Sequence, residues 1–129
     1  MVLRLIKVPM NMGAGKVGTE LAPDIIGDHI KRVLDVPIEE ELIKCQSCFE
    51  FSEPIVIGNM MFPNEICKSC LELSNECYSA LKDGEFPLVV GGDHSLSWGG
   101  RLRGLVDFMM IWVLCISMPT GTVIFLKLV

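Results

Sequence analysis

The chain of 129 residues has only two histidines, and this scarcity limits the metal sites it can build. Eleven Lys and Arg against sixteen Asp and Glu give a net charge of −5, and no basic stripe runs along the chain. We therefore expect no nucleic acid as a partner, because nothing is placed to follow a phosphate backbone. The N-terminus has charges within its apolar part and no long apolar core, so we expect no signal peptide.

Six cysteines without an export signal indicate a reducing compartment, and we expect a cytoplasmic protein. With 50% hydrophobic residues, the chain can form one domain with a modest core. Strand and helix patterns alternate over its first hundred residues, which predicts βαβ units, a mainly parallel sheet and an α/β fold. The expected strands are Val2–Val8, Glu40–Cys45 and Phe86–Val90, and the expected helices are Ala22–Asp35 and Asn64–Gly84, with residues 48–64 mostly loop.

Both expected helices have apolar residues at helical spacing. The first helix has Pro23 in its first turn and places Ile25, Ile26, His29, Ile30 and Val33 on one side. The second helix repeats Ile66, Cys70, Leu73, Cys77 and Leu81 at intervals of three or four residues. Asn64 is its expected N-cap, and Gly84 is expected to end it.

The stretch "FPLVVGGDHSLSWGG" places a histidine directly after a buried strand. Gly91 and Gly92 allow a sharp turn there, so Asp93 and His94 should lie at the rim of the sheet, where α/β proteins build ligand sites. A neutral imidazole at this position could bind a transition metal, with Asp93 orienting it. From the spacing alone, a simple turn with an N-cap and a hydrogen-bonded histidine is the favoured interpretation, and the metal site is the alternative.

The string "LVVGGDHSLSWG" resembles the first metal-binding motif of the ureohydrolases, the family of arginase, agmatinase and formiminoglutamase. The earlier "VPMNMGAGKVGTELAPDII" is similar to the N-terminal signature of that family, and within the family the chain looks most like arginase. The resemblance covers roughly residues 3–99. It implies that residues 1–100 are part of a three-layer α/β/α domain, namely its N-terminal portion with a mainly parallel sheet.

The resemblance also implies a chemistry. Family members hydrolyse L-arginine to L-ornithine and urea with a hydroxide that bridges two manganese ions, which are held by histidines and several aspartates. Only His94 matches a metal ligand of the family; Gly91, Gly92 and Ser95 shape the turn, and Asp93 is not assigned as a ligand. No catalytic residue is assigned, and the residues that would bind L-arginine are unknown. The resemblance leaves a homo-oligomer open for the intact enzyme.

The second ligand motif of the family, Asp-Ala-His-x-Asp, is missing, and so is its later Asp-x-Asp motif. The other histidine, His29, falls inside the first expected helix. One histidine cannot hold two metal ions, so we expect the chain as written to be inactive.

Residues 101–129 form a hydrophobic tail of a different character. "FMMIWVLCISMPTGTVIFL", residues 108–126, has 19 residues without a charge, the length of a transmembrane helix, although Pro119 and Gly121 weaken that interpretation. If the tail were an anchor, the protein would be a membrane-tethered interaction protein. Of the interpretations of the tail, we expect the membrane anchor to be the weaker one.

The genetic code offers another explanation of the tail. If the last nucleotide of each codon is joined to the first two of the next, Met109–Met110 and Met110–Ile111 must encode Asp, Trp112–Val113 must encode Gly, and Met118–Pro119 must encode Ala. Together with these forced residues, the other pairs permit the sequence Tyr-Asp-Asp-Leu-Gly-Val-Leu-Tyr-Ile-Asp-Ala-His-Gly-Asp. This sequence contains the missing motif. We infer that the chain is translated out of frame from about Gly100.

The cysteines support a competing hypothesis from another class of protein. The pairs Cys45/Cys48 and Cys67/Cys70 have the spacing of a structural zinc site, which would make the chain a small zinc-binding module. Neither pair has the Gly or Pro that usually shapes a zinc knuckle, and the second pair falls within a helical pattern. This hypothesis therefore remains an alternative to the ureohydrolase interpretation.

Overall fold

The computed structural model describes residues 1–13, 18–93, 95–96, 112–117 and 122–127, and the last two ranges by their backbone alone. His94 and residues 97–111, with the beginning of the tail, lie outside the described residues. The strands are β1 (Leu3–Val8), β2 (Ile38–Leu42), β3 (Val56–Ile57), β4 (Met60–Met61), β5 (Phe86–Gly91), β6 (Trp112–Ser117) and β7 (Thr122–Lys127). The helices are α1 (Ala22–Val33), α2 (Pro63–Lys82) and the short 3-10 helices η1 (Thr19–Leu21) and η2 (Cys48–Glu50).

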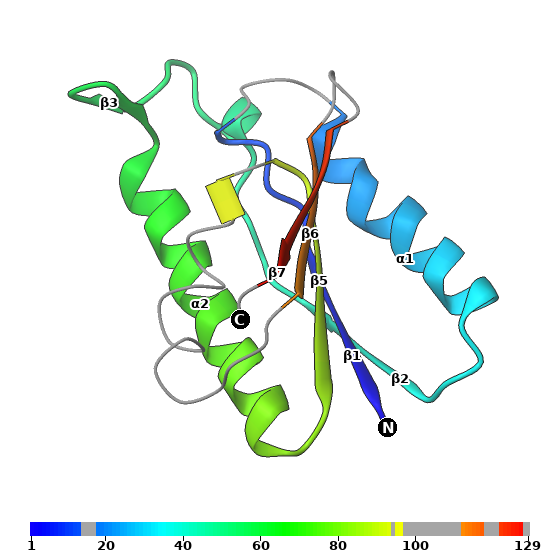
Figure 1. Cartoon of the computed structure of the whole chain (residues 1–129). Coiled ribbons are helices and arrows are strands. Elements are labelled where there is room, and N and C mark those ends of the chain that lie inside the picture. The colour runs from blue at the N-terminus through cyan, green and yellow to red at the C-terminus, as the bar shows by residue number, and fades with distance from the viewer. Residues whose placement is uncertain (14–17, 94, 97–111, 118–121, 128–129) are drawn as a thin grey trace.

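Five strands form one sheet in the order β2-β1-β5-β6-β7. Within this sheet the pairs β1/β2, β1/β5 and β5/β6 are parallel, and the pair β6/β7 is antiparallel. The expected parallel α/β fold is therefore confirmed. The chain moves from β1 to β2 on one side, then returns past β1 to β5, so right-handed crossovers place α1 and α2 on opposite faces of the sheet (Figure 1).

The core lies between the sheet and α2. Leu73 and Cys77 of α2 are fully buried and belong to the same cluster as Ile6, Val8 and Val89 of the central strands. This is the face that the spacing of apolar residues in the second helix predicts, and Ile66 and Leu81 pack against its edge. Parallel strands in the middle of a sheet are covered on both faces, which explains why β1 and β5 have few exposed positions.

Helix α2 begins earlier than the sequence predicts. The expected N-cap, Asn64, is wrong: Phe62 is the N-cap, in the left-handed region with φ 49°, and Pro63 follows as the first helical residue. Phe62 is 3% exposed and its ring lies 5.1 Å from that of Phe51, so burial of an aromatic ring takes precedence over a side-chain cap. The expected end at Gly84 is confirmed, because α2 stops at Lys82 and Gly84 adopts φ 76°.

Strand β2 begins two residues and ends three residues earlier than expected, and it lies at an exposed edge of the sheet. Its glutamates are tolerated there because the basic residues of β1 reach across to them: Arg4 pairs with Glu39, and Lys7 with Glu40. Lys7 also donates to Asp24 of α1 at 2.7 Å, so one ammonium group joins β1, β2 and α1. These hydrogen bonds raise the pKa of Lys7. A charged edge strand also resists edge-to-edge association.

The interpretation of the tail as a transmembrane helix is wrong, because residues 112–117 and 122–127 form two strands of the sheet. In the described part of the chain, no helix has both the length and the apolar character needed to cross a membrane. Residues 48–64, expected mostly as loop, contain the short hairpin of β3 and β4.

The burial of α2 leads to a stability prediction. Leu73→Ala should lower the free energy of unfolding by about 2–5 kcal/mol, because it leaves a cavity in the core. Leu71→Ala, on the same helix but 52% exposed, should change it by less than about 0.5 kcal/mol. Denaturation in guanidinium chloride measures both, and equal effects of the two substitutions would contradict this placement of the core.

Candidate functional site

The central strands β1 and β5 define the place where an α/β sheet of this topology binds ligands. The connection after β1 leads to β2 and the connection after β5 leads to β6, on opposite sides of the β1/β5 pair. The loop after β1 and the turn after β5 therefore flank the switch point of the sheet at the carboxyl ends of the strands. Residues of these two segments and of the loop after β2 form one polar group that we call the switch-point cluster. It consists of Asn11, Gly13, Glu20, Ser47, Gly92, Asp93 and Ser95.

Asp93 joins the loop after β1 to the turn after β5. It is only 2% exposed, and its carboxylate accepts from the backbone N–H of Gly13 at 2.8 Å and from that of Ser95 at 2.9 Å. The hydroxyl of Ser95 donates to the same carboxylate. Asp93 and Ser95 are the chain neighbours of His94, so these bonds fix the backbone on both sides of the predicted metal ligand.

Neighbouring atoms lie so close to Gly91 and Gly92 that neither position has room for a side chain. A Cβ at Gly92 would lie 2.1 Å from the carbonyl oxygen of Met10 and 2.7 Å from that of Thr19. A Cβ at Gly91 would lie 1.9 Å from Cδ1 of Leu96, which folds back over the turn. The sequence predicts these glycines as turn residues, and the structure shows that Gly92 lets two loops touch through their backbones.

A second set of hydrogen bonds ties the loop after β1 to the loop after β2. Asn11 is fully buried; its amide donates to the hydroxyl of Ser47 at 2.9 Å and to Glu20 at 3.3 Å, and its carbonyl accepts from the N–H of Cys48 at 2.9 Å. Glu20 also accepts from the N–H of Gly18 at 3.0 Å. Hydrogen bonds from backbone N–H groups, its own first, and from Asn11 hold the pKa of Glu20 below its usual value.

Sequence reasoning missed Asn11 and Glu20. Both lie in the glycine-rich segment after β1, where short polar residues are ordinary turn formers. The only signal that could have distinguished Asn11 is its position between two methionines, Met10 and Met12, which are both buried. A polar residue flanked by buried apolar residues needs internal partners.

The four-cysteine zinc site is not formed. Cys67 is exposed on α2, whereas Cys70 is buried and its Sγ lies 3.6 Å from the carbonyl oxygen of Ser95. Burial raises the pKa of the Cys45 thiol to about 11. Within residues 1–13, 18–93 and 95–96, no three His, Cys, Asp or Glu side chains are grouped so that they could hold a metal ion. The zinc hypothesis is therefore wrong.

The same finding bears on the manganese ions that the family resemblance implies. The described residues do not offer a ligand set for two divalent cations, because Asp93 is occupied by backbone donors and His29 lies exposed on α1. His94 lies outside the described residues, and its assignment as a metal ligand stays a prediction.

The arrangement is that of a parallel α/β protein with its candidate site at the switch point, and comparison with known proteins identifies the class. Residues 2–113 match the Arginase family, and the chain belongs to that family. The curated arginase of Bacillus subtilis (strain 168) is 25% identical over an alignment of 125 residues that covers 85% of this chain and 38% of the relative.

Solved structures agree on the fold. The crystal structure of arginase from Bacillus subtilis aligns with a TM-score of 0.60 and 24% identity, covering 77% of this chain and 31% of that one. The Entamoeba histolytica arginase in complex with L-ornithine aligns with a TM-score of 0.63 and 23% identity, covering 76% and 34%. The chain has the fold of the N-terminal portion of these proteins and spans about a third of their length.

The close approach at Gly92 gives a direct test of the cluster. Gly92→Ala should destabilise the protein by about 1–3 kcal/mol, because the added methyl group meets two backbone carbonyls that cannot rotate away. Thermal unfolding followed by circular dichroism measures the change.

The matched control is Gly84→Asn. Gly84 has a left-handed φ that Asn tolerates, and no atom lies within 4 Å of the position that a Cβ would take there. This substitution should change stability by less than about 0.5 kcal/mol. If Gly92→Ala were as mild as the control, the two loops would not be in backbone contact.

Proposed function

We propose that this chain is the N-terminal portion of an arginase-type ureohydrolase, whose intact form hydrolyses L-arginine to L-ornithine and urea with two manganese ions. The observation that supports the proposal most strongly is the turn at the switch point of an arginase fold, where Gly92 and Asp93 precede His94 and the N–H of Ser95 after it donates to Asp93. The Arginase family generally uses manganese. The complex of the Entamoeba histolytica relative with L-ornithine, the product of arginine hydrolysis, supports the substrate class.

Within this proposal, residues 1–100 are the in-frame part of the domain and residues 101–129 are translated out of frame. The family match extends to residue 113. The position of the proposed change of frame, near Gly100, therefore rests on the coding argument and not on the match. Strand β6 favours the proposal, because it runs parallel to β5 and its carboxyl end lies at the same edge of the sheet as the turn at Asp93. The alternative frame places Asp-Ala-His-x-Asp directly after this strand.

The chain as written should not hydrolyse arginine. Purified protein with manganese and L-arginine is expected to release no more urea than its His94→Ala variant, because the described residues hold no group of metal-binding side chains. The Bacillus subtilis arginase serves as the positive control for the assay. Urea release above that of the His94→Ala variant would contradict the expected inactivity.

The coding DNA and its transcript test the proposed function itself. Sequencing from the Trp98 codon onward is expected to show one extra or missing nucleotide near Gly100, with an open frame beyond it that encodes further aspartate motifs. Protein expressed from the corrected frame should release urea in the presence of manganese, and His94→Ala should abolish this release. An intact frame that ends at Val129 in both DNA and transcript would contradict the proposal.

A further inference from the structure

The β3–β4 hairpin exposes apolar side chains on both of its faces. Figure 1 shows the hairpin extending away from the sheet beyond the start of α2. Val56 lies opposite Met61 and Ile57 lies opposite Met60, so each of these pairs shares one face of the hairpin. All four residues are exposed, Met60 by 60% and Ile57 by 55%. Neither face is therefore part of the core that the described residues form.

A hairpin of this kind needs further contacts to be stable. Two strands alone are marginally stable in water, and among the described strands β3 and β4 pair only with each other. The segment from Pro54 to Asn64 contains no charged residue. By contrast, the edge strand β2 of the main sheet has three glutamates, and charge is a usual protection of an exposed edge. The sequence thus protects one edge against association and leaves the hairpin without this protection.

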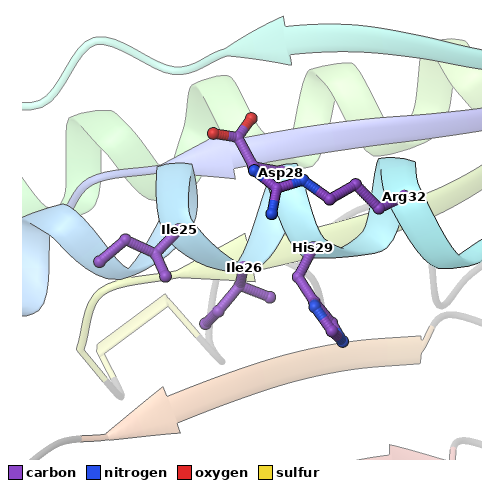
Figure 2. Close-up of a pocket in the computed structure, with 5 residues that line it drawn as sticks. All are labelled: Ile25, Ile26, Asp28, His29 and Arg32. Carbon is purple, nitrogen blue, oxygen red and sulfur yellow. The ribbon is translucent and has the colours of Figure 1, made fainter.

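The cavity beside α1 differs from the hairpin in its charge. It has a volume of about 620 Å³, and its lining combines apolar, charged and imidazole side chains: Ile25, Ile26, Asp28, His29 and Arg32 (Figure 2). Charged groups that enter an interface lose hydration and must find partners there. The uncharged hairpin has no such requirement, and this makes it the more suitable contact surface.

We propose that the β3–β4 hairpin is a self-association surface, and that it packs against the hairpin of a second copy in a two-fold dimer. Near a two-fold axis each residue meets its own counterpart, so a charge would face its like, whereas an apolar side chain is compatible with itself. An uncharged segment is also the place where two chains of net charge −5 approach with the least repulsion. The inference rests on the hairpin alone and is independent of the proposed function.

The exposed area of the hairpin is sufficient for such a contact. From their exposed fractions, the residues from Ile55 to Met61 present roughly 500 Å² per copy, so two copies would bury about 1,000 Å², the lower limit for a specific interface. An interface at this limit favours a dimer that forms reversibly.

Analytical ultracentrifugation of the full chain tests the proposal, at concentrations up to about 500 μM because small interfaces bind weakly. We expect a reversible equilibrium between monomer and dimer. Ile57→Lys should raise the dissociation constant about tenfold or more, because two ammonium groups would face each other across the axis. The matched control is Leu71→Lys on α2, at a position that is 52% exposed, and it should leave the constant unchanged. Circular dichroism of each variant confirms that it is folded.

A charge-reversal pair tests the two-fold geometry. Ile57→Glu alone should dissociate the dimer as Ile57→Lys does, for the same reason. An equimolar mixture of the two variants should associate again, because a carboxylate then faces an ammonium group across the axis. Sedimentation of the mixture, compared with that of each variant alone, measures this rescue.

Four outcomes would overturn the proposal. They are a chain that stays monomeric at the highest concentration, a dimer that Ile57→Lys leaves intact, and a mixture of the two charged variants that does not associate. The fourth is binding of the monomer to phosphatidylcholine vesicles that Ile57→Lys abolishes, because the hairpin would then contact a lipid surface.

Methionine oxidation locates the contact in the unmodified chain. Met1 is 80% exposed and Met60 is 60% exposed, so dilute hydrogen peroxide should convert both to the sulfoxide in the monomer. In the dimer, Met60 should be protected while Met1 reacts as before, which peptide mass spectrometry at a low and a high chain concentration measures. Equal oxidation of Met60 at both concentrations would place the contact elsewhere and overturn the proposal.

Discussion

The hydrogen bonds that converge on the carboxylate of Asp93 determine the geometry at the carboxyl end of the sheet. Backbone N–H groups that leave a strand lose their ladder partners and must find others when they are buried. Asp93 satisfies this requirement for Gly13 and Ser95 at once, and it is buried at 2% exposure. An asparagine would place its own N–H donors against either the N–H of Gly13 or the donors of Ser95. Only a carboxylate can accept all of these hydrogen bonds.

The approach of the two loops depends on the absence of a side chain at Gly92. With the carbonyls of Met10 and Thr19 at 2.1 and 2.7 Å from its Cβ position, even a methyl group would separate the loops. Separation would move Gly13 away from Asp93 and break the bond between the loops. The glycine and the aspartate of the motif are therefore two parts of one constraint, and neither fixes the turn without the other.

The sequence predicted the elements whose pattern is decided locally and missed those decided by packing. The buried row of α2 was predictable, because Leu73 and Cys77 repeat at helical spacing, and so was the end of α2 at Gly84. The start of α2 was not, because burial of Phe62 decides it. The same spacing found the apolar side of α1 but could not tell that Gly27 is the residue that meets the sheet. At the site, the motif pointed to Asp93, whereas Asn11 has a role that only the contact with Ser47 reveals.

The turn at Asp93 and the missing metal ligands lie on different sides of the proposed change of frame. The residues of the switch-point cluster all precede Gly100, so a change of frame in the tail would leave them as they are. The missing Asp-Ala-His-x-Asp motif belongs to the tail and follows from the proposed frame alone. The proposed frame therefore accounts for a complete hydrogen-bonded turn at Asp93 beside a tail without the second ligand motif.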